Sequence, residues 1–282
     1  MSAPYPLVRN SYAFATRFGV SRRPSRPGSS PSSASNCLIS SCICLFYIST
    51  FCLTVFSTVF AEAQNADALY ADRENIASAR QAVEIWAADL QREPQGPATF
   101  EAAWKLARAT YWLGGHAPEN ERRTFLENGI KASQKAIALQ PDRPEGHFWM
   151  AANMGELAES FGMRQGLKYR KPIKDALETT LRLDPAFLQG SADRALGRWY
   201  FRVPGLFGGS NKDAEAHLRK SLRYNPNSCA SLFFLAEVLL DEGRKNEGRM
   251  ELQKAIDAPF DPDWTPEDKD FKEKARALLS KR

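Results

Sequence analysis

Three arginines spaced four residues apart form the most chemically suggestive pattern in the chain. Arg194, Arg198 and Arg202 share one face if their segment is helical, where like charges repel by roughly a few tenths of a kcal/mol. Each guanidinium group offers paired donors that suit a carboxylate. The stripe therefore predicts a carboxylate-bearing partner such as an acidic peptide. Alternatively, the three arginines bind no partner and are either solvated or paired with acidic residues of neighbouring repeats.

A glycine-rich segment follows the stripe. It lacks the Gly-Lys-Ser/Thr ending and the preceding strand of a phosphate-binding loop, so it predicts tight backbone turns instead of a nucleotide site. Its two large apolar side chains either pack into the fold or meet a partner. The candidate partner contacts are Pro204, Gly205, Leu206, Phe207, Gly208 and Gly209.

Residues for catalysis or metal binding are sparse. The chain has three histidines, His116, His147 and His217, and no nucleophile motif, acid pair or Cys/His spacing accompanies them. His147 is expected to be a partly buried helix residue, and Cys229 a small buried one. The sequence predicts no enzyme, no metal site and no cofactor.

The elements that position these residues are predicted to be helices. From about residue 66 apolar residues recur every three or four positions, and no segment alternates as strands do. Prolines that end helices recur at intervals of 47, 44, 41 and 33 residues, namely Pro94, Pro141, Pro185, Pro226 and Pro259. This periodicity predicts a repeat architecture.

The repeated segments resemble the tetratricopeptide repeat, a helical hairpin of about 34 residues. The clearest copy, residues 227–260, carries the pattern at Leu232, Leu235, Ala236, Leu239, Gly243, Gly248, Leu252 and Ala255. The cores of three earlier copies begin at Trp104, Trp149 and Leu196. A lone helix around Trp86 precedes these copies. A charged capping helix is expected from Thr265 to Arg282. Residues beyond the basic unit fall mostly at 115–122, 162–172 and 203–210, which predicts extended loops within the hairpins, gathered along one edge.

The segment from Ala195 to Phe201, followed by the glycine-rich loop, is similar to exported bacterial repeat proteins related to the T-component of TRAP transporters. It also resembles, more distantly, animal regulators of microtubule dynamics. The first resemblance implies a periplasmic accessory that associates with a solute-binding protein and forms oligomers. The repeat family's groove positions, carried over to this chain, are Lys105, Trp112, His147, Met150, Arg194, Arg198, Phe201, Arg202 and Phe233.

A basic and apolar leader precedes the helical region. The net charge of +5 reflects five arginines in the first 36 residues, with no acid before Glu62, and the rest is close to neutral. An apolar run at 37–60 and a small-residue site predict a secretory signal cleaved after Ala63, or an uncleaved anchor, in preference to a mitochondrial-type transit peptide.

The sequence therefore predicts an all-α superhelix of about four irregular hairpins in residues 64–282, behind a leader in residues 1–63. The predicted function is an exported, periplasmic scaffold that binds another protein in a concave groove. The alternative is an accessory of a TRAP-type uptake system that binds a solute-binding protein or a small organic acid. No nucleic-acid partner is expected, and membrane contact is assigned to residues 37–60 if they are not cleaved. The sequence leaves open whether the chain forms a homo-oligomer.

Overall fold

The computed structural model describes residues 65–92 and 95–281, and over these ranges the chain is helical without a strand. The all-α prediction is confirmed. The predicted leader, residues 1–63, lies outside the described residues. Within the ranges that the structure covers, no helix combines the length and apolar character needed to cross a bilayer.

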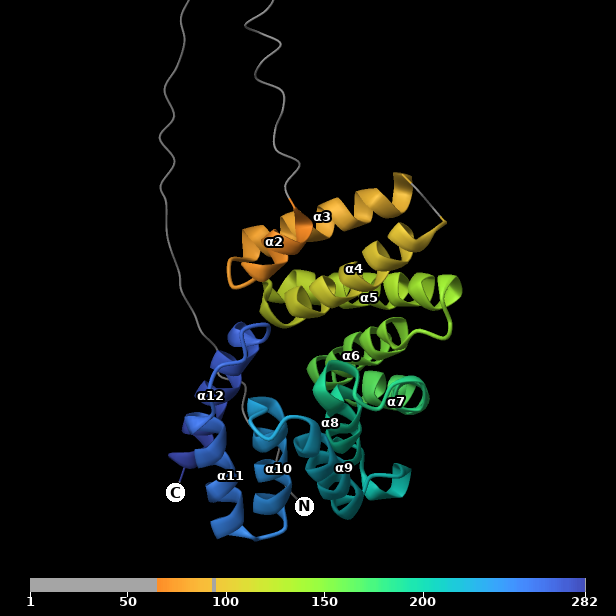
Figure 1. Cartoon of the computed structure of the whole chain (residues 1–282). Helices are drawn as coiled ribbons and strands as arrows, with labels where there is room; N and C mark the ends of the chain where they lie inside the picture. The colour runs from red at the N-terminus through yellow and green to blue at the C-terminus, as the bar shows by residue number, and fades with distance from the viewer. Residues whose placement is uncertain (1–64, 93–94, 282) are drawn as a thin grey trace, which may run out of the picture. The chain divides into compact units, whose positions relative to one another are not determined.

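Four helical hairpins follow one another, and each packs on the next (Figure 1). Two helices precede the hairpins and one follows them. The elements are α2 (Ala66–Ala71), α3 (Ile76–Arg92), α4 (Pro97–His116), α5 (Glu119–Leu139), α6 (Pro144–Ser160), α7 (Met163–Leu183), α8 (Phe187–Arg202), the 3-10 turn η1 (Gly205–Phe207), α9 (Asn211–Tyr224), α10 (Cys229–Asp241), α11 (Lys245–Asp257) and α12 (Thr265–Leu279). The hairpins are α4/α5, α6/α7, α8/α9 and α10/α11, as the proline spacing predicts.

The extra residues of the first two hairpins lengthen helices where extended loops were expected. Only Ala117 and Pro118 separate α4 from α5, and only Phe161 and Gly162 separate α6 from α7. Gly162 has φ +85°, a left-handed conformation that lets the second connection stay short. The third hairpin alone keeps an extended connection, which contains η1.

Pro172 lies inside α7 and does not end it. Proline removes one backbone donor from a helix and usually kinks or breaks it. Here the indole Nε1 of Trp199 donates to the carbonyl oxygen of Arg170 at 2.9 Å, which supplies a donor beside the interrupted turn. This contact comes from α8 and is invisible to local sequence patterns.

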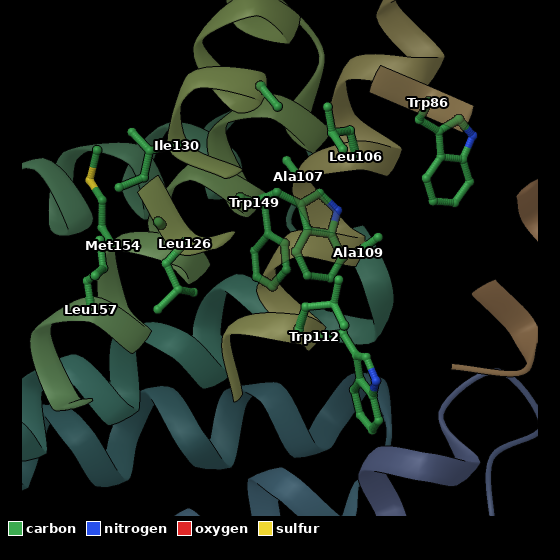
Figure 2. Packing of buried hydrophobic residues seen from close by; sticks show 14 of the residues in the cluster. Trp86, Leu106, Ala107, Ala109, Trp112, Leu126, Ile130, Trp149, Met154 and Leu157 are labelled. Atoms are coloured by element: carbon green, nitrogen blue, oxygen red, sulfur yellow. The ribbon is translucent and has the colours of Figure 1, made fainter. Parts of the chain in front are cut away.

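The main core runs through the first three hairpins and includes Trp86, Trp112, Trp149, Leu126 and Met154 (Figure 2). Close helix contacts depend on small residues: a β-carbon on Gly197 would lie 2.5 Å from Leu218, so no larger residue fits there without movement. Cys229 is buried, as predicted, and burial raises the pKa of its thiol to about 12.

A buried asparagine joins the first two hairpins. Asn153 of α6 donates from Nδ2 to the carbonyl oxygens of Ala107 at 3.0 Å and Trp149 at 2.8 Å. Its side chain is fully buried, and its nitrogen is paired twice while Oδ1 has no hydrogen-bond partner in the described structure. The hydrogen bond to Ala107 therefore fixes α6 against α4.

The capping helix α12 is confirmed on α10 and α11, and its residues also reach the first helices of the array. Arg73, in the α2–α3 connection, donates from Nε to Glu267 at 3.0 Å. Lys269 pairs with Glu74 at 2.7 Å, and His116 at the end of α4 contacts Asp270 at 2.8 Å. These three contacts join the two ends of the helical array, which the sequence did not predict.

Candidate interaction surface

The first helices of three hairpins and the segment before α12 line a partly open cavity of about 220 Å³. Its wall is mainly aromatic and apolar, with one basic and one acidic side chain. The lining residues are Trp104 and Arg108 of α4, Glu145 and Trp149 of α6, Phe187 and Leu188 of α8, and Trp264. The arrangement suits a bulky apolar group that carries or adjoins a negative charge.

Arg108 is the positively charged group of the cavity wall. Its guanidinium carbon lies 4.1 Å from the ring centre of Tyr70 and 5.0 Å from that of Trp104. Its nearest acidic partner is Asp67 at 3.8 Å, and its Nε is buried without a hydrogen-bond partner in the described structure. Burial lowers the pKa of Arg108, although the guanidinium stays charged. Arg108 therefore has a buried Nε without a partner, and its side chain is 21% exposed with no acid closer than 3.8 Å.

Arg194 of α8 is a second incompletely paired arginine, although it is not one of the residues that line the cavity. Burial lowers its pKa, while Tyr111, Asp268 and Glu267 oppose that effect through their charge. Among the residues that the structure describes, no acid lies within ion-pair distance of Arg194. Glu267 also acts on Arg108 electrostatically, so α12 contributes negative charge near both guanidinium groups.

The other two arginines of the predicted stripe are occupied by acids of neighbouring hairpins. Arg198 donates to both carboxylate oxygens of Glu159 at 3.0 and 2.9 Å, and to Glu237 at 2.5 Å. Arg202 approaches Glu159 at 3.8 Å. Burial opposes ionisation of Glu159, but Arg198 outweighs it and lowers the pKa of that carboxyl group. Arg198 therefore pairs with acidic residues of adjacent repeats and does not present a free guanidinium to a partner.

The remaining groove candidates are dispersed. Lys105 pairs with Asp67 at 2.9 Å, and His147 Nε2 contacts the carbonyl oxygen of Pro141 at 2.9 Å. Met150 and Phe201 are half-buried against the core.

Trp112 and Phe233 are buried inside the fold. The Trp112 indole donates to the carbonyl oxygen of Arg73 at 2.7 Å, and its ring stacks on His116 at 3.6 Å. The Phe233 ring lies 5.7 Å from that of Phe271 in α12. Arg73 and His116 pack against Trp112, and Phe271 of α12 packs against Phe233, so both candidates are part of the core.

The glycine-rich loop is placed apart from the cavity wall. Leu206 is 91% exposed and Phe207 is 41% exposed, so these side chains are not tucked into the array. The guanidinium carbon of Arg170 in α7 lies 5.1 Å from the Phe207 ring centre. Gly208 takes φ +100°, which supplies the tight turn that the glycines predict.

A strained turn at the start of α8 shapes the cavity. Leu188, Gln189 and Gly190 have φ values of 44°, 58° and 77°. Left-handed backbone costs roughly 1–2 kcal/mol for each non-glycine residue. Gln189 donates to Asp261 at 3.0 Å, and Asn225 donates to Gln189. These bonds hold the turn and place Leu188 in the wall.

Sequence reasoning missed most of the cavity. It assigned Trp104 and Trp149 to packing and singled out none of the other lining residues. Arg108 does follow Trp104 by one helical turn, a spacing at which an arginine can cover an indole. Trp264 offers no such signal, because it lies after the last hairpin in the sequence and far along the chain from the other lining residues. No group of three or more His, Cys, Asp or Glu residues in the described ranges could hold a metal ion.

Comparison with known proteins gives consistent results for the fold and family. Residues 63–208 match the family described as Regulator of microtubule dynamics protein 1-3. The chain is 26% identical over 152 residues to Regulator of microtubule dynamics protein 3 of Rattus norvegicus, covering 54% of this chain and 32% of that protein. It is 23% identical over 207 residues to Regulator of microtubule dynamics protein 1 of Caenorhabditis elegans, covering 68% of this chain and 89% of that protein.

A solved structure supports the fold alone. The thermophilic TPR protein of Thermus thermophilus superposes with a TM-score of 0.57 at 21% identity, covering 77% of this chain and 98% of that one. The tetratricopeptide-type fold is thereby confirmed. The chain spans about a third of the length of the rat relative.

Proposed function

The chain belongs to the Regulator of microtubule dynamics protein 1-3 family, and from this premise we propose that it is a protein-binding module whose cavity wall holds an acidic segment of a partner. Stacked helical hairpins are a common scaffold for protein recognition. The family relationship favours a partner in the microtubule system, since the matched relatives carry that description.

The cavity between the first three hairpins carries this proposal. At about 220 Å³ it is smaller than the roughly 300 Å³ at which sites for drug-sized molecules begin. One bulky apolar side chain suits it better than a large cofactor. Trp104, Trp149 and Trp264 supply aromatic contact area of the kind that dominates binding energy at interfaces.

Arg108 supplies the preference for an acidic partner. The Arg108 side chain is 21% exposed, and a carboxylate at the exposed part of its guanidinium would gain a charge-assisted hydrogen bond. Glu145, the acid of the wall, is already bonded by Arg143 at 3.2 Å, so its charge is compensated. We therefore propose a segment with a large apolar residue beside an acidic residue or a C-terminal carboxylate.

Co-sedimentation with polymerised tubulin tests this function. We expect Arg108→Gln and Trp104→Ala each to weaken binding by about tenfold or more, because each removes an interface anchor. The matched control is Arg249→Gln, an exposed arginine on α11 outside the cavity, which should bind as the parent does. Absence of binding would remove the microtubule partner, and equal binding by all variants would remove the cavity.

A small organic acid is a second candidate, favoured by the partly exposed guanidinium of Arg108 beside an apolar cavity. A thermal-shift screen with millimolar organic acids should raise the melting temperature of the parent protein but not that of Arg108→Gln. Shifts that survive this substitution would place the acid elsewhere.

The T-component resemblance, an uptake role and export remain predictions, and export depends on residues 1–63. N-terminal sequencing of the chain recovered from its host tests the leader. A mature chain starting at Gln64 would support cleavage after Ala63, and a chain that retains Met1 in the cytosol would refute export.

A further inference from the structure

A second surface, separate from the cavity, combines exposed apolar tips with unpaired positive charge. It consists of the first three turns of α7, residues 163–174, and the η1 loop, residues 203–210. We name it the α7–η1 edge. From this edge we infer a docking site for an anionic membrane surface, a function beyond the proposed protein-binding role.

The apolar part of the edge protrudes into solvent. Leu206 is 91% exposed, Met163 is 81% exposed, and Leu167 and Phe207 are 46% and 41% exposed. These four belong to the seven large hydrophobic side chains that are exposed in the described ranges. Because they project outward from helix ends and a turn, they do not form the shaped hollow that a protein anchor would need. A fluid bilayer interface accepts such protruding side chains without shape complementarity.

Helical periodicity and contacts place the two apolar groups on the same edge. Met163, Leu167, Arg170 and Lys174 follow the spacing of one helical stripe on α7. At the far end of this stripe, the Arg170 guanidinium covers the Phe207 ring at 5.1 Å, and the Lys174 amine lies 5.2 Å from the ring centre of Trp199. The stripe therefore faces η1, and α7 packs directly on α8, which leads into the loop (Figure 1).

The charge of the edge is strongly positive. Residues 163–174 contain five basic residues and no acid, residues 203–210 contain no charged residue, and Lys212 lies just beyond the loop beside Asp213. The basic residues are Arg164, Lys168, Arg170, Lys171, Lys174 and Lys212. Lys171 pairs with Asp175 at 2.5 Å and Lys174 approaches Glu178 at 3.7 Å. Arg164, Lys168 and Arg170 form no ion pair with any acid in the described part of the chain.

This combination matches what a peripheral membrane site requires. Several basic residues near an anionic leaflet attract the protein, and apolar side chains at the same height enter the headgroup region. The sequence assigns membrane contact to residues 37–60 alone. The α7–η1 edge adds a contact made by the folded array.

Hydrogen–deuterium exchange of the full chain with lipid vesicles tests the inference locally, so that binding through other segments does not obscure it. With vesicles containing about one third phosphatidylserine, we expect amides in residues 203–210 to exchange at least about fivefold more slowly than with phosphatidylcholine vesicles. The double variant Arg164→Glu/Lys168→Glu should lose this difference, and Leu206→Ser/Phe207→Ser should lose most of it.

The matched control is Arg249→Glu/Met250→Ser on α11, where an exposed basic residue adjoins a methionine that is 59% exposed. It should keep the full protection at residues 203–210. Circular dichroism should be unchanged in all variants, since the substituted side chains are exposed. Equal protection by neutral and anionic vesicles, or loss of protection in the control, would overturn the inference. Protection by soluble poly-glutamate but not by vesicles would also overturn it and indicate a protein partner.

Discussion

Arg198 and Arg108 each lie on the first helix of a hairpin, α8 and α4, yet their surroundings differ completely. Arg198 binds two carboxylates from the hairpins on either side, Glu159 of α6 and Glu237 of α10. Arg108 lies over two aromatic rings, with an acid no nearer than 3.8 Å and a donor left unused. The difference teaches that arginines on equivalent helices can either join adjacent repeats through carboxylates or lie beside a cavity without a close acid.

The largest effect expected from this comparison is on stability at Arg198. Arg198→Ala should lower the free energy of unfolding by about 2 kcal/mol, because it removes charge-assisted hydrogen bonds to two partly exposed carboxylates. Urea denaturation measures the loss. Arg182→Ala, an exposed arginine on α7, is the control and should change stability little. A cost at Arg198 no larger than that of the control would remove its structural role.

Substitution of Arg108 should weaken binding more than it lowers stability, whereas substitution of Arg198 should mainly lower stability. Arg108→Gln loses contacts with the Tyr70 and Trp104 rings, and we expect a cost of about 1 kcal/mol in the free energy of unfolding. Denaturation and microtubule co-sedimentation on the same preparations compare the two effects. Destabilisation as large as at Arg198, with no change in binding, would erase the distinction between the two sites.

Acid should weaken the Arg198 site by a smaller amount. The pKa of Glu159 is lowered in the folded state, so its contribution is present above the unfolded pKa of about 4.3 and is lost as pH falls through the folded value. Glu159 is 35% exposed, so solvent screening should keep this contribution below about 1 kcal/mol. Urea titrations of the parent and Arg198→Met between pH 6 and pH 3, spanning about that range, measure it. Parallel pH profiles would show that Glu159 does not depend on Arg198.

The sequence was sufficient to predict the hairpins because the patterns that define each helix lie within that helix and at its ends. Closing prolines such as Pro141 and Pro226, with periodic apolar residues between them, predict helices and their order. The same signals failed at Pro172, where a hydrogen bond from Trp199 accompanies a helix that continues.

The candidate site was harder to predict, since each part depends on residues far apart in the chain. The sequence identifies Arg194, Arg198 and Arg202 as one stripe, but Glu159 and Glu237, each 39 residues from Arg198, determine that Arg198 is neutralised. Periodicity within one helix contains no information on these distant acids. The sequence left open whether Leu206 and Phe207 pack into the array or face a partner, and the structure exposes both side chains.

The contact between α12 and the α2–α3 connection has a consequence for how the protein unfolds. In a repeat protein with free ends, each unit interacts only with its neighbours, and terminal units can fray alone. Here the Arg73–Glu267 and Lys269–Glu74 pairs connect the first unit to the last. Fraying at either terminus therefore breaks contacts at both, and the array should melt as one cooperative unit, with amide exchange at its two ends rising together.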